Sequence, residues 1–221
     1  MQILNPFDLK ADIENALSAF PGLKMKDESG VLGIVGEIEL IDPLSQVPFE
    51  TFSVELYYPP GYPLCFPKVI ETGGKIERIP DRHINIGDNN TLCLAVGPEE
   101  KLLCRFRINT TRFIKDVLLP RLAEEYEVNN GGKYAREYSH GANGVWEYYF
   151  KKTDTRDTRL VLRLIDCTIK SSEPKGSEGC ICGSGLKYKK CHKSVINELS
   201  HLGTKYLQFQ YHYLASNKYT K

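Results

Sequence analysis

Residues 58–94 read YPPGYPLCFPKVIETGGKIERIPDRHINIGDNNTLCL and contain the features that decide the fold. A proline-punctuated turn is followed by a short apolar run over 68–72, and glycine and asparagine are then frequent up to residue 94. A long irregular stretch inside a compact domain is usually functional. Here it contains a His-x-Asn at His83 and Asn85 and, eight residues after the asparagine, Cys93. This order places a thiol on a loop near a side-chain amide, a pair that suits acyl transfer through a thioester.

The residues around this stretch predict one helix followed by an antiparallel meander. Asn5 and Pro6 fit a helix cap and first turn, and an apolar helical face continues to Phe20 before Pro21 and Gly22. Strict alternation predicts strands over 31–41 and around the apolar even positions 52 to 58, with a short strand over 68–72. This order is an α+β layout.

A second helix is expected after the irregular stretch. Asn109 or Thr110 caps it, its apolar residues continue to Leu122, and Pro120 is expected to kink it. The aromatic stretch 138–150 is expected to pack back on the same domain. Residues 160–169 fit either a strand or a short helix, and the tail fits one helix on the spacing of Leu199, Leu202, Tyr206 and Phe209.

Composition narrows the class of protein. The chain has 221 residues and a net charge of +1, so no global field recruits nucleic acid or anionic lipid. No apolar run approaches the roughly 20 residues that cross a bilayer, and MQILNPFDLK lacks the pattern of a secretory signal. The seven cysteines are therefore expected to be reduced thiols or metal ligands. These features predict a cytoplasmic protein without a membrane or nucleic-acid partner.

The layout of residues 58–94 resembles the core of ubiquitin-conjugating enzymes, in which a proline-rich loop precedes His-Pro-Asn and then an acceptor cysteine before a leucine. The resemblance covers about residues 5–150, and Ile84 replaces the family's proline. It implies an N-terminal helix, an antiparallel meander, an active-site loop and C-terminal helices. It also implies that Cys93 carries the acyl group, that His83 holds the loop, and that Asn85 assists the oxyanion or pins the loop.

Two other interpretations of Cys93 stay open. Between Leu92 and Leu94 it also fits a buried small apolar residue in a binding module without catalysis. A cysteine hydrolase would instead need an imidazole, from His83 or His140, within hydrogen-bond reach of the sulfur. The remaining thiols outside the tail fit core or half-buried positions, with Cys104 a candidate neighbour of Cys93: Cys65, Cys104 and Cys167.

The C-terminal part contains four soft ligands within thirteen positions, namely Cys180, Cys182, Cys191 and His192. Zinc takes four nitrogen or sulfur donors in a tetrahedron, and a segment this short needs a metal to fold. The string CICGSGLKYKKCH resembles the SEC-C motif found at the end of the bacterial secretion ATPase. The resemblance implies a structural zinc and a docking role towards proteins or ribosomes. The surrounding lysines make the module basic or form only a solvated face: Lys187, Lys189, Lys190 and Lys193.

These observations predict a domain over 1–152, a linker over 153–175, a zinc module over 176–195 and a helical tail over 196–221. The function expected is a conjugating enzyme that carries a protein C-terminus as a thioester on Cys93 and transfers it to an amine or another nucleophile. The chain lacks a nucleotide-binding glycine motif after a strand, so a separate activating enzyme is expected. Bacterial proteins of this kind occur in anti-phage operons, which implies a nucleotidyltransferase resembling cyclic GMP–AMP synthase as partner. The alternative is a non-catalytic adaptor with a zinc docking module.

Overall fold

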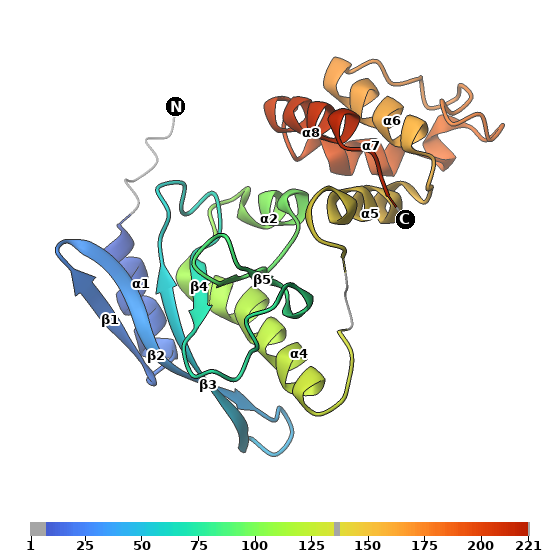
Figure 1. Cartoon of the computed structure of the whole chain (residues 1–221). Helices are drawn as coiled ribbons and strands as arrows, with labels where there is room; N and C mark the ends of the chain where they lie inside the picture. Colours follow the sequence, from blue (N-terminus) through green and yellow to red (C-terminus); the bar gives the residue numbers. More distant parts are fainter. Residues whose placement is uncertain (1–7, 135–137, 221) are drawn as a thin grey trace. The chain divides into compact units, whose positions relative to one another are not determined.

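The chain forms two compact units, shown in a computed structural model that describes residues 8–134 and 138–220 (Figure 1). The described residues of the first unit fall within 1–95 and 106–136. Those of the second unit fall within 96–105 and 137–221. The mixed α+β class predicted from the sequence is confirmed, because the first unit has an antiparallel sheet with helices and the second is helical.

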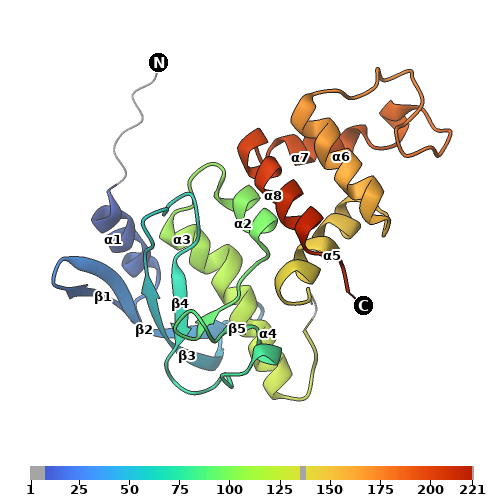
Figure 2. The ribbon, with the colours of Figure 1, turned by 45° about the horizontal axis from the view of Figure 1, so that its top comes forward.

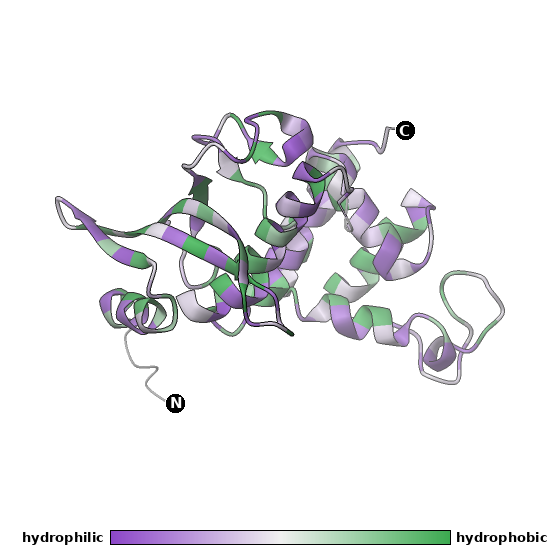
Figure 3. Cartoon of the chain, turned by 90° about the horizontal axis from the view of Figure 1, so that it is seen from below, coloured by the Kyte–Doolittle hydropathy of each residue, from purple (hydrophilic) through white to green (hydrophobic). Residues whose placement is uncertain are grey.

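The first unit is built on a four-stranded antiparallel sheet in the order β1-β2-β3-β4 (Figures 1 and 2). Its strands are β1 (Leu23–Glu28), β2 (Val31–Ile41), β3 (Pro48–Tyr57) and β4 (Lys68–Glu71). Apolar and polar residues alternate along β2 and β3, as the banded colouring in Figure 3 shows. The apolar face is buried and comprises Ile34, Ile38, Leu40, Phe52, Val54 and Leu56.

Strand β1 was not predicted from the sequence. Its residues, LKMKDE, include four charged side chains, so the apolar alternation that marks a strand is short. Backbone pairing with β2 places Leu23 opposite Gly36. A side chain at Gly36 would put its Cβ 2.3 Å from the carbonyl oxygen of Gly22, so glycine permits this close approach.

Helix α1 (Leu9–Ala19) lies against β1 and β2. Its N-cap is Asp8, whose carboxylate accepts a hydrogen bond from the Ala11 amide at 3.1 Å. The predicted cap at Asn5 and Pro6 lies outside the described residues. The apolar face of α1 buries Ile13 and Ala16, as the spacing predicts.

The second predicted helix is one helical path made of α3 (Thr110–Phe113), a π-helical turn (Ile114–Leu118) and α4 (Leu119–Asn129). Asn109 is the N-cap, and its side chain accepts from the Arg112 amide at 2.8 Å. The interruption expected at Pro120 takes the form of the π turn just before it. Proline has no N–H to donate to the preceding turn, and the wider π turn accommodates that loss.

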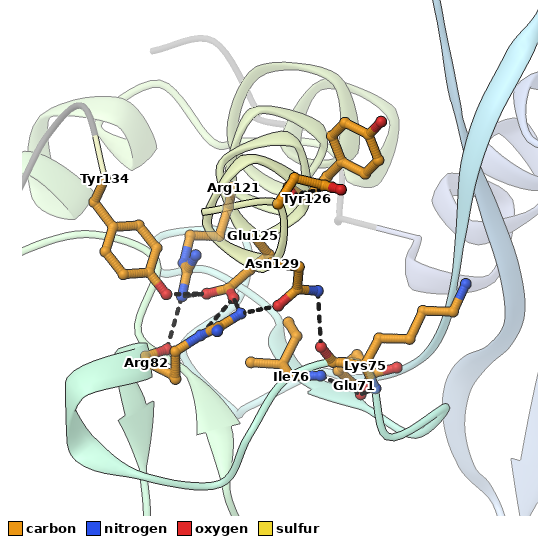
Figure 4. Close-up of polar contacts among 10 residues, drawn as sticks. Glu71, Lys75, Ile76, Arg82, Arg121, Glu125, Tyr126, Asn129 and Tyr134 are labelled. Carbon is orange, nitrogen blue, oxygen red and sulfur yellow. Dashed lines mark hydrogen bonds and ion pairs between the residues drawn. The ribbon is translucent and has the colours of Figure 1, made fainter. Parts of the chain in front are cut away.

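A buried carboxylate on α4 joins this helix to the irregular stretch (Figure 4). Glu125 is fully buried and forms ion pairs with Arg82 and Arg121. Tyr134 donates a hydrogen bond to Oε1 of Glu125 at 2.6 Å. Arg121 donates to the backbone carbonyl oxygen of Arg82 at 2.9 Å. Arg82 precedes His83 directly, so this cluster fixes the start of the candidate site.

Two further contacts fix the same stretch upstream (Figure 4). The buried Glu71 accepts hydrogen bonds from the backbone amides of Gly73 and Gly74 at 2.8 and 2.9 Å. Asn129, at the end of α4, donates to the carbonyl oxygen of Lys75 at 3.0 Å. The irregular residues 73–83 are thus held by side chains in place of regular secondary structure.

The second unit consists of helices α2 (Gly97–Cys104), α5 (Gly141–Thr153), α6 (Thr158–Lys170), α7 (Lys193–Ser200) and α8 (Thr204–Ser216). Helices α5, α6 and α8 pack on one another around a largely aromatic core: Trp146, Tyr148, Tyr149, Phe150, Val161, Ile165, Leu199, Leu202, Leu207 and Leu214. The unit therefore has an apolar core of its own.

Three expectations for this part differ from the structure. Residues 160–169 form a helix within α6, which lies in the stretch expected as a linker. The aromatic stretch 138–150 lies in the second unit, so the division differs from a boundary at residue 152. The prediction of one tail helix was wrong, because Gly203, with φ 83°, separates α7 from α8. Phe209 is accordingly exposed, not part of a continuous apolar face.

The ion-pair cluster on α4 gives a stability prediction. Glu125→Gln should lower the free energy of unfolding of the first unit by about 3–5 kcal/mol, because it leaves the buried Arg121 and the half-buried Arg82 without a compensating charge. Urea unfolding followed by circular dichroism measures this. Glu127→Gln, at an exposed position of the same helix, is the matched control and should change stability by no more than about 0.5 kcal/mol. Equal effects of the two substitutions would contradict the role given to Glu125.

Candidate functional site

The three predicted active-site residues lie at a small β-hairpin. Strand β5 (Ile84–Asn85) pairs with β6 (Thr91–Leu92), with Ile84 opposite Leu92 and Asn85 opposite Thr91. The turn between them has Asn89 and Asn90 in the left-handed region, with φ 50° and 58°. The irregular stretch is therefore ordered where the chemistry was predicted.

Cys93 continues this pairing beyond β6. Its amide donates a hydrogen bond to the carbonyl oxygen of His83 at 2.7 Å. Asn85 and Thr91 are directly opposed and so share one face of the hairpin. Ile84 and Leu92 point to the other face and are buried. The backbone bond to His83 holds Cys93 at the open end of the hairpin that carries Asn85.

The carboxamide of Asn85 belongs to a chain of polar contacts. It donates to the Thr91 hydroxyl at 3.3 Å, and that hydroxyl donates to Asp88 at 3.2 Å. Lys68 pairs with Asp88 at 2.7 Å, and this contact lowers the pKa of the Asp88 carboxyl. The contact with Thr91 fixes where the Asn85 carboxamide lies.

The cysteines outside the tail differ in accessibility. Cys93 and Cys65 are half-buried, whereas Cys104 and Cys167 are buried. The interpretation of Cys65, Cys104 and Cys167 as core or half-buried thiols is confirmed. Cys93 as a residue is therefore not sealed in the interior.

The two histidines considered for a hydrolase lie in different settings. The ring of His83 packs edge-on against Tyr134, with ring centroids 5.1 Å apart. His83 also ends a short 3-10 turn (Pro80–Arg82) in the left-handed region, with φ 50°. His140 is the N-terminal cap position of α5 in the second unit. The backbone carbonyl group of His83 accepts the Cys93 amide, and its ring contacts Tyr134.

The four predicted metal ligands come together in the second unit. The ligand atoms of Cys180, Cys182, Cys191 and His192 all lie within 4.8 Å of one another. The Cys182 and Cys191 sulfurs are 3.6 Å apart, and His192 Nδ1 lies 3.1 Å from the Cys191 sulfur and 3.3 Å from that of Cys180. A tetrahedron with zinc–sulfur bonds of ~2.3 Å has edges of about 3.8 Å. The donor set and spacing thus fit zinc.

Short local contacts shape this ligand loop. Gly183 and Gly185, both with φ 77°, turn the chain, and the Cys180 amide donates to the Leu186 carbonyl oxygen at 2.8 Å. Burial alone would raise the pKa of Cys182, but hydrogen bonds with Ser184, Cys180 and Cys191 together lower that pKa. Tyr188 is buried and anchors the loop in a small core with Leu164, Cys167, Cys180 and Ile196.

Comparison with known proteins identifies one part of the chain. Residues 177–194 match the SEC-C motif, which contains all four ligands. No curated protein and no solved structure matches the chain. The metal-binding character of the C-terminal module thus rests on a motif and a geometry that agree. Separately, over residues 8–134 and 138–220 every helix is too short or too polar to span a bilayer.

Several residues that support these sites were not singled out from the sequence. In the hairpin they are Asp88 and Thr91, whose contact depends on the strand pairing and leaves no pattern in the sequence. Glu125 occupies a position among the apolar residues of α4, and a charged residue on a buried helical face is the signal that marks it. The contact between His192 and Thr153 could not be predicted from residue types, because His192 contacts the backbone carbonyl group of Thr153 and every residue has such a group.

The ligand geometry predicts metal content. The purified chain should contain one zinc ion, and a variant with Cys180→Ser and Cys182→Ser should contain none, because two of four donors are lost. Inductively coupled plasma mass spectrometry measures both. Cys65→Ser, far from the ligands in sequence and in the other unit, is the control and should keep its zinc. Zinc retained by the double variant would show that other residues bind it.

Proposed function

We propose that the first unit is an acyl carrier of the ubiquitin-conjugating type, with Cys93 as the acceptor thiol. The observation that supports this proposal is the hairpin, which carries Asn85 on β5 and is joined at its open end to the half-buried Cys93 by a backbone hydrogen bond. The order of elements supports it: a helix, an antiparallel meander, an irregular loop with the cysteine, and then a long helical path. The resemblance of residues 58–94 to that family gives the specific fold.

The chemistry proposed is exchange of one thioester for another. The Cys93 thiolate attacks the carbonyl carbon of a thioester held by an activating protein, a new carbon–sulfur bond forms, and the donor thiolate leaves and takes a proton. An amine then attacks the carbonyl carbon, loses a proton, and displaces Cys93 as the thiolate. Each attack forms an oxyanion, which a nearby amide donor stabilises. We assign that role to Asn85.

The partners proposed follow from this chemistry. The chain has no nucleotide-binding glycine motif, so an activating enzyme must supply the thioester. The acyl group would be the C-terminus of a modifier or target protein. We place the reaction in bacterial anti-phage defence, with a nucleotidyltransferase resembling cyclic GMP–AMP synthase as the protein acted on, and this assignment rests on the resemblance alone.

A second candidate is an adaptor that binds partners without catalysis. One observation favours it: the four lysines of the zinc module are exposed, and none takes part in the ion pairs found among the described residues. Such a face can dock on an acidic partner. Both functions can coexist, because the lysines and Cys93 lie in different units.

The carrier proposal predicts a covalent adduct. The full chain incubated with extract of its own cells and ATP should gain mass that a thiol reductant removes, and Cys93→Ala should abolish this gain. Cys65→Ala, which removes the other half-buried thiol of the unit, should leave it unchanged. Intact mass spectrometry without reductant reads both. Loss of the adduct only in Cys65→Ala would show that Cys65, not Cys93, is the acceptor thiol. If the wild-type chain forms no adduct but still binds partner proteins from the extract, the adaptor function is favoured.

The role of Asn85 is tested by separating loading from discharge. If the amide stabilises the oxyanion of amine attack, Asn85→Ala should slow discharge by on the order of 100-fold and change loading far less. Single-turnover discharge of the loaded protein to free lysine measures this. Thr91→Val is the matched control, because it breaks the contact that holds the carboxamide while keeping the carboxamide itself. Equal loss of loading and discharge in both variants would show that Asn85 mainly pins the loop.

A further inference from the structure

We infer that the metal centre acts as a C-terminal cap of helix α5 through the imidazole of His192, so that metal occupancy stabilises the helical core of the second unit. The ring faces two groups at once. Its Nδ1 lies 3.1 and 3.3 Å from the sulfurs of Cys191 and Cys180, and its Nε2 lies 3.3 Å from the carbonyl oxygen of Thr153. The ring therefore bridges the ligand loop and α5.

The protonation of the ring follows from this position. A nitrogen that binds a metal ion carries no proton, so with Nδ1 as the ligand the single ring proton sits on Nε2. That Nε2–H then donates to Thr153. A metal-bound imidazole commonly donates its other N–H to a carbonyl or carboxylate oxygen, which fixes the tautomer and the ring orientation.

Thr153 is where α5 needs such a donor. It is the last residue of the helix, and the last four carbonyl groups of a helix have no partner within it. The chain leaves α5 at Asp154 in the left-handed region, with φ 49°. A donor on a ring polarised by a cation also suits the negative end of the helix dipole. His192 thus satisfies a backbone group that the helix leaves open.

His192 joins a third element as well. It is the cap position of α7, and its carbonyl oxygen accepts from the Ile196 amide at 3.0 Å. Helix α5 in turn carries the chain's single tryptophan, Trp146, which is buried and donates to the Asn217 carbonyl oxygen at 2.7 Å. One ligand therefore connects the metal loop, the start of α7 and the helix that holds the aromatic core.

Through the contact between His192 and Thr153, the stability of α5 depends on metal binding. With the metal bound, the ring has one tautomer and its donor points at Thr153. Without it, either nitrogen can carry the proton, and the clustered thiols lose the cation that holds them together. Helix α5 should then fray at its last turn first, because Thr153 lies in that turn. The amides of Asp154 and Thr155 report this fraying, because both donate to the Phe150 carbonyl oxygen in the same turn.

The experiment uses the full chain labelled with nitrogen-15 and loaded with zinc. Long-range proton–nitrogen spectra should show His192 bound to the metal through Nδ1 and protonated at Nε2; binding through Nε2 would overturn the inference on the wild type alone. Hydrogen exchange should show that chelation of the zinc reduces protection of the Asp154 and Thr155 amides by about fivefold or more, the effect of one hydrogen bond. Trp146 fluorescence should change with them.

Two variants separate the cap from metal binding itself. His192→Cys keeps four sulfur donors for zinc but has no donor for Thr153, so protection of the two amides should fall while the zinc content stays at one. Glu198→Gln is the control, because it breaks the ion pair between Lys152 of α5 and α7 without touching the ligands, and the two amides should keep their metal-dependent protection. Unchanged protection in His192→Cys with zinc bound, or unchanged protection in the wild type after chelation, would overturn the inference.

Discussion

The carboxylate of Glu125 is the constraint on which the candidate acyl-carrier site depends. A buried arginine, a half-buried arginine and a tyrosine surround it, and the half-buried one, Arg82, is the residue just before His83. A charge inside a protein is tolerated only when it is paired and hydrogen-bonded, so this cluster permits few arrangements of its members. The irregular stretch thus gains, from side chains on α4, the fixed position that regular strands gain from backbone pairing.

The sequence predicted those parts of the first unit that repeat with a period. The alternation in β2 and β3 and the apolar face of α1 are local patterns, and the structure has them. Strand β1 was missed because its residues are mostly charged and it is defined by its neighbour. The hairpin that joins Asn85 to Cys93 was also beyond prediction, since its register depends on Asn89 and Asn90 adopting positive φ.

The second unit shows the same division between local and long-range information. The ligand set was predictable, because four soft donors around two glycines have few other uses. The sequence of α6 fits both a strand and a helix, because its apolar residues are numerous enough to satisfy either pattern and the partner surfaces on α5 and α8 come from distant sequence. The bond from His192 to Thr153 lies beyond any residue pattern, since every residue offers a carbonyl group.

His83 contributes to the site in two separate ways: its left-handed backbone presents a carbonyl group to Cys93, and its ring contacts Tyr134. The hydrogen bond that holds Cys93 uses the carbonyl group of His83, so it is indifferent to the imidazole. An L residue in this conformation costs roughly 1–2 kcal/mol, and glycine adopts it freely. Glycine or asparagine at this position would therefore keep the turn, but each would lose the ring contact with Tyr134. A β-branched residue would strain the turn that presents this carbonyl group to the Cys93 amide.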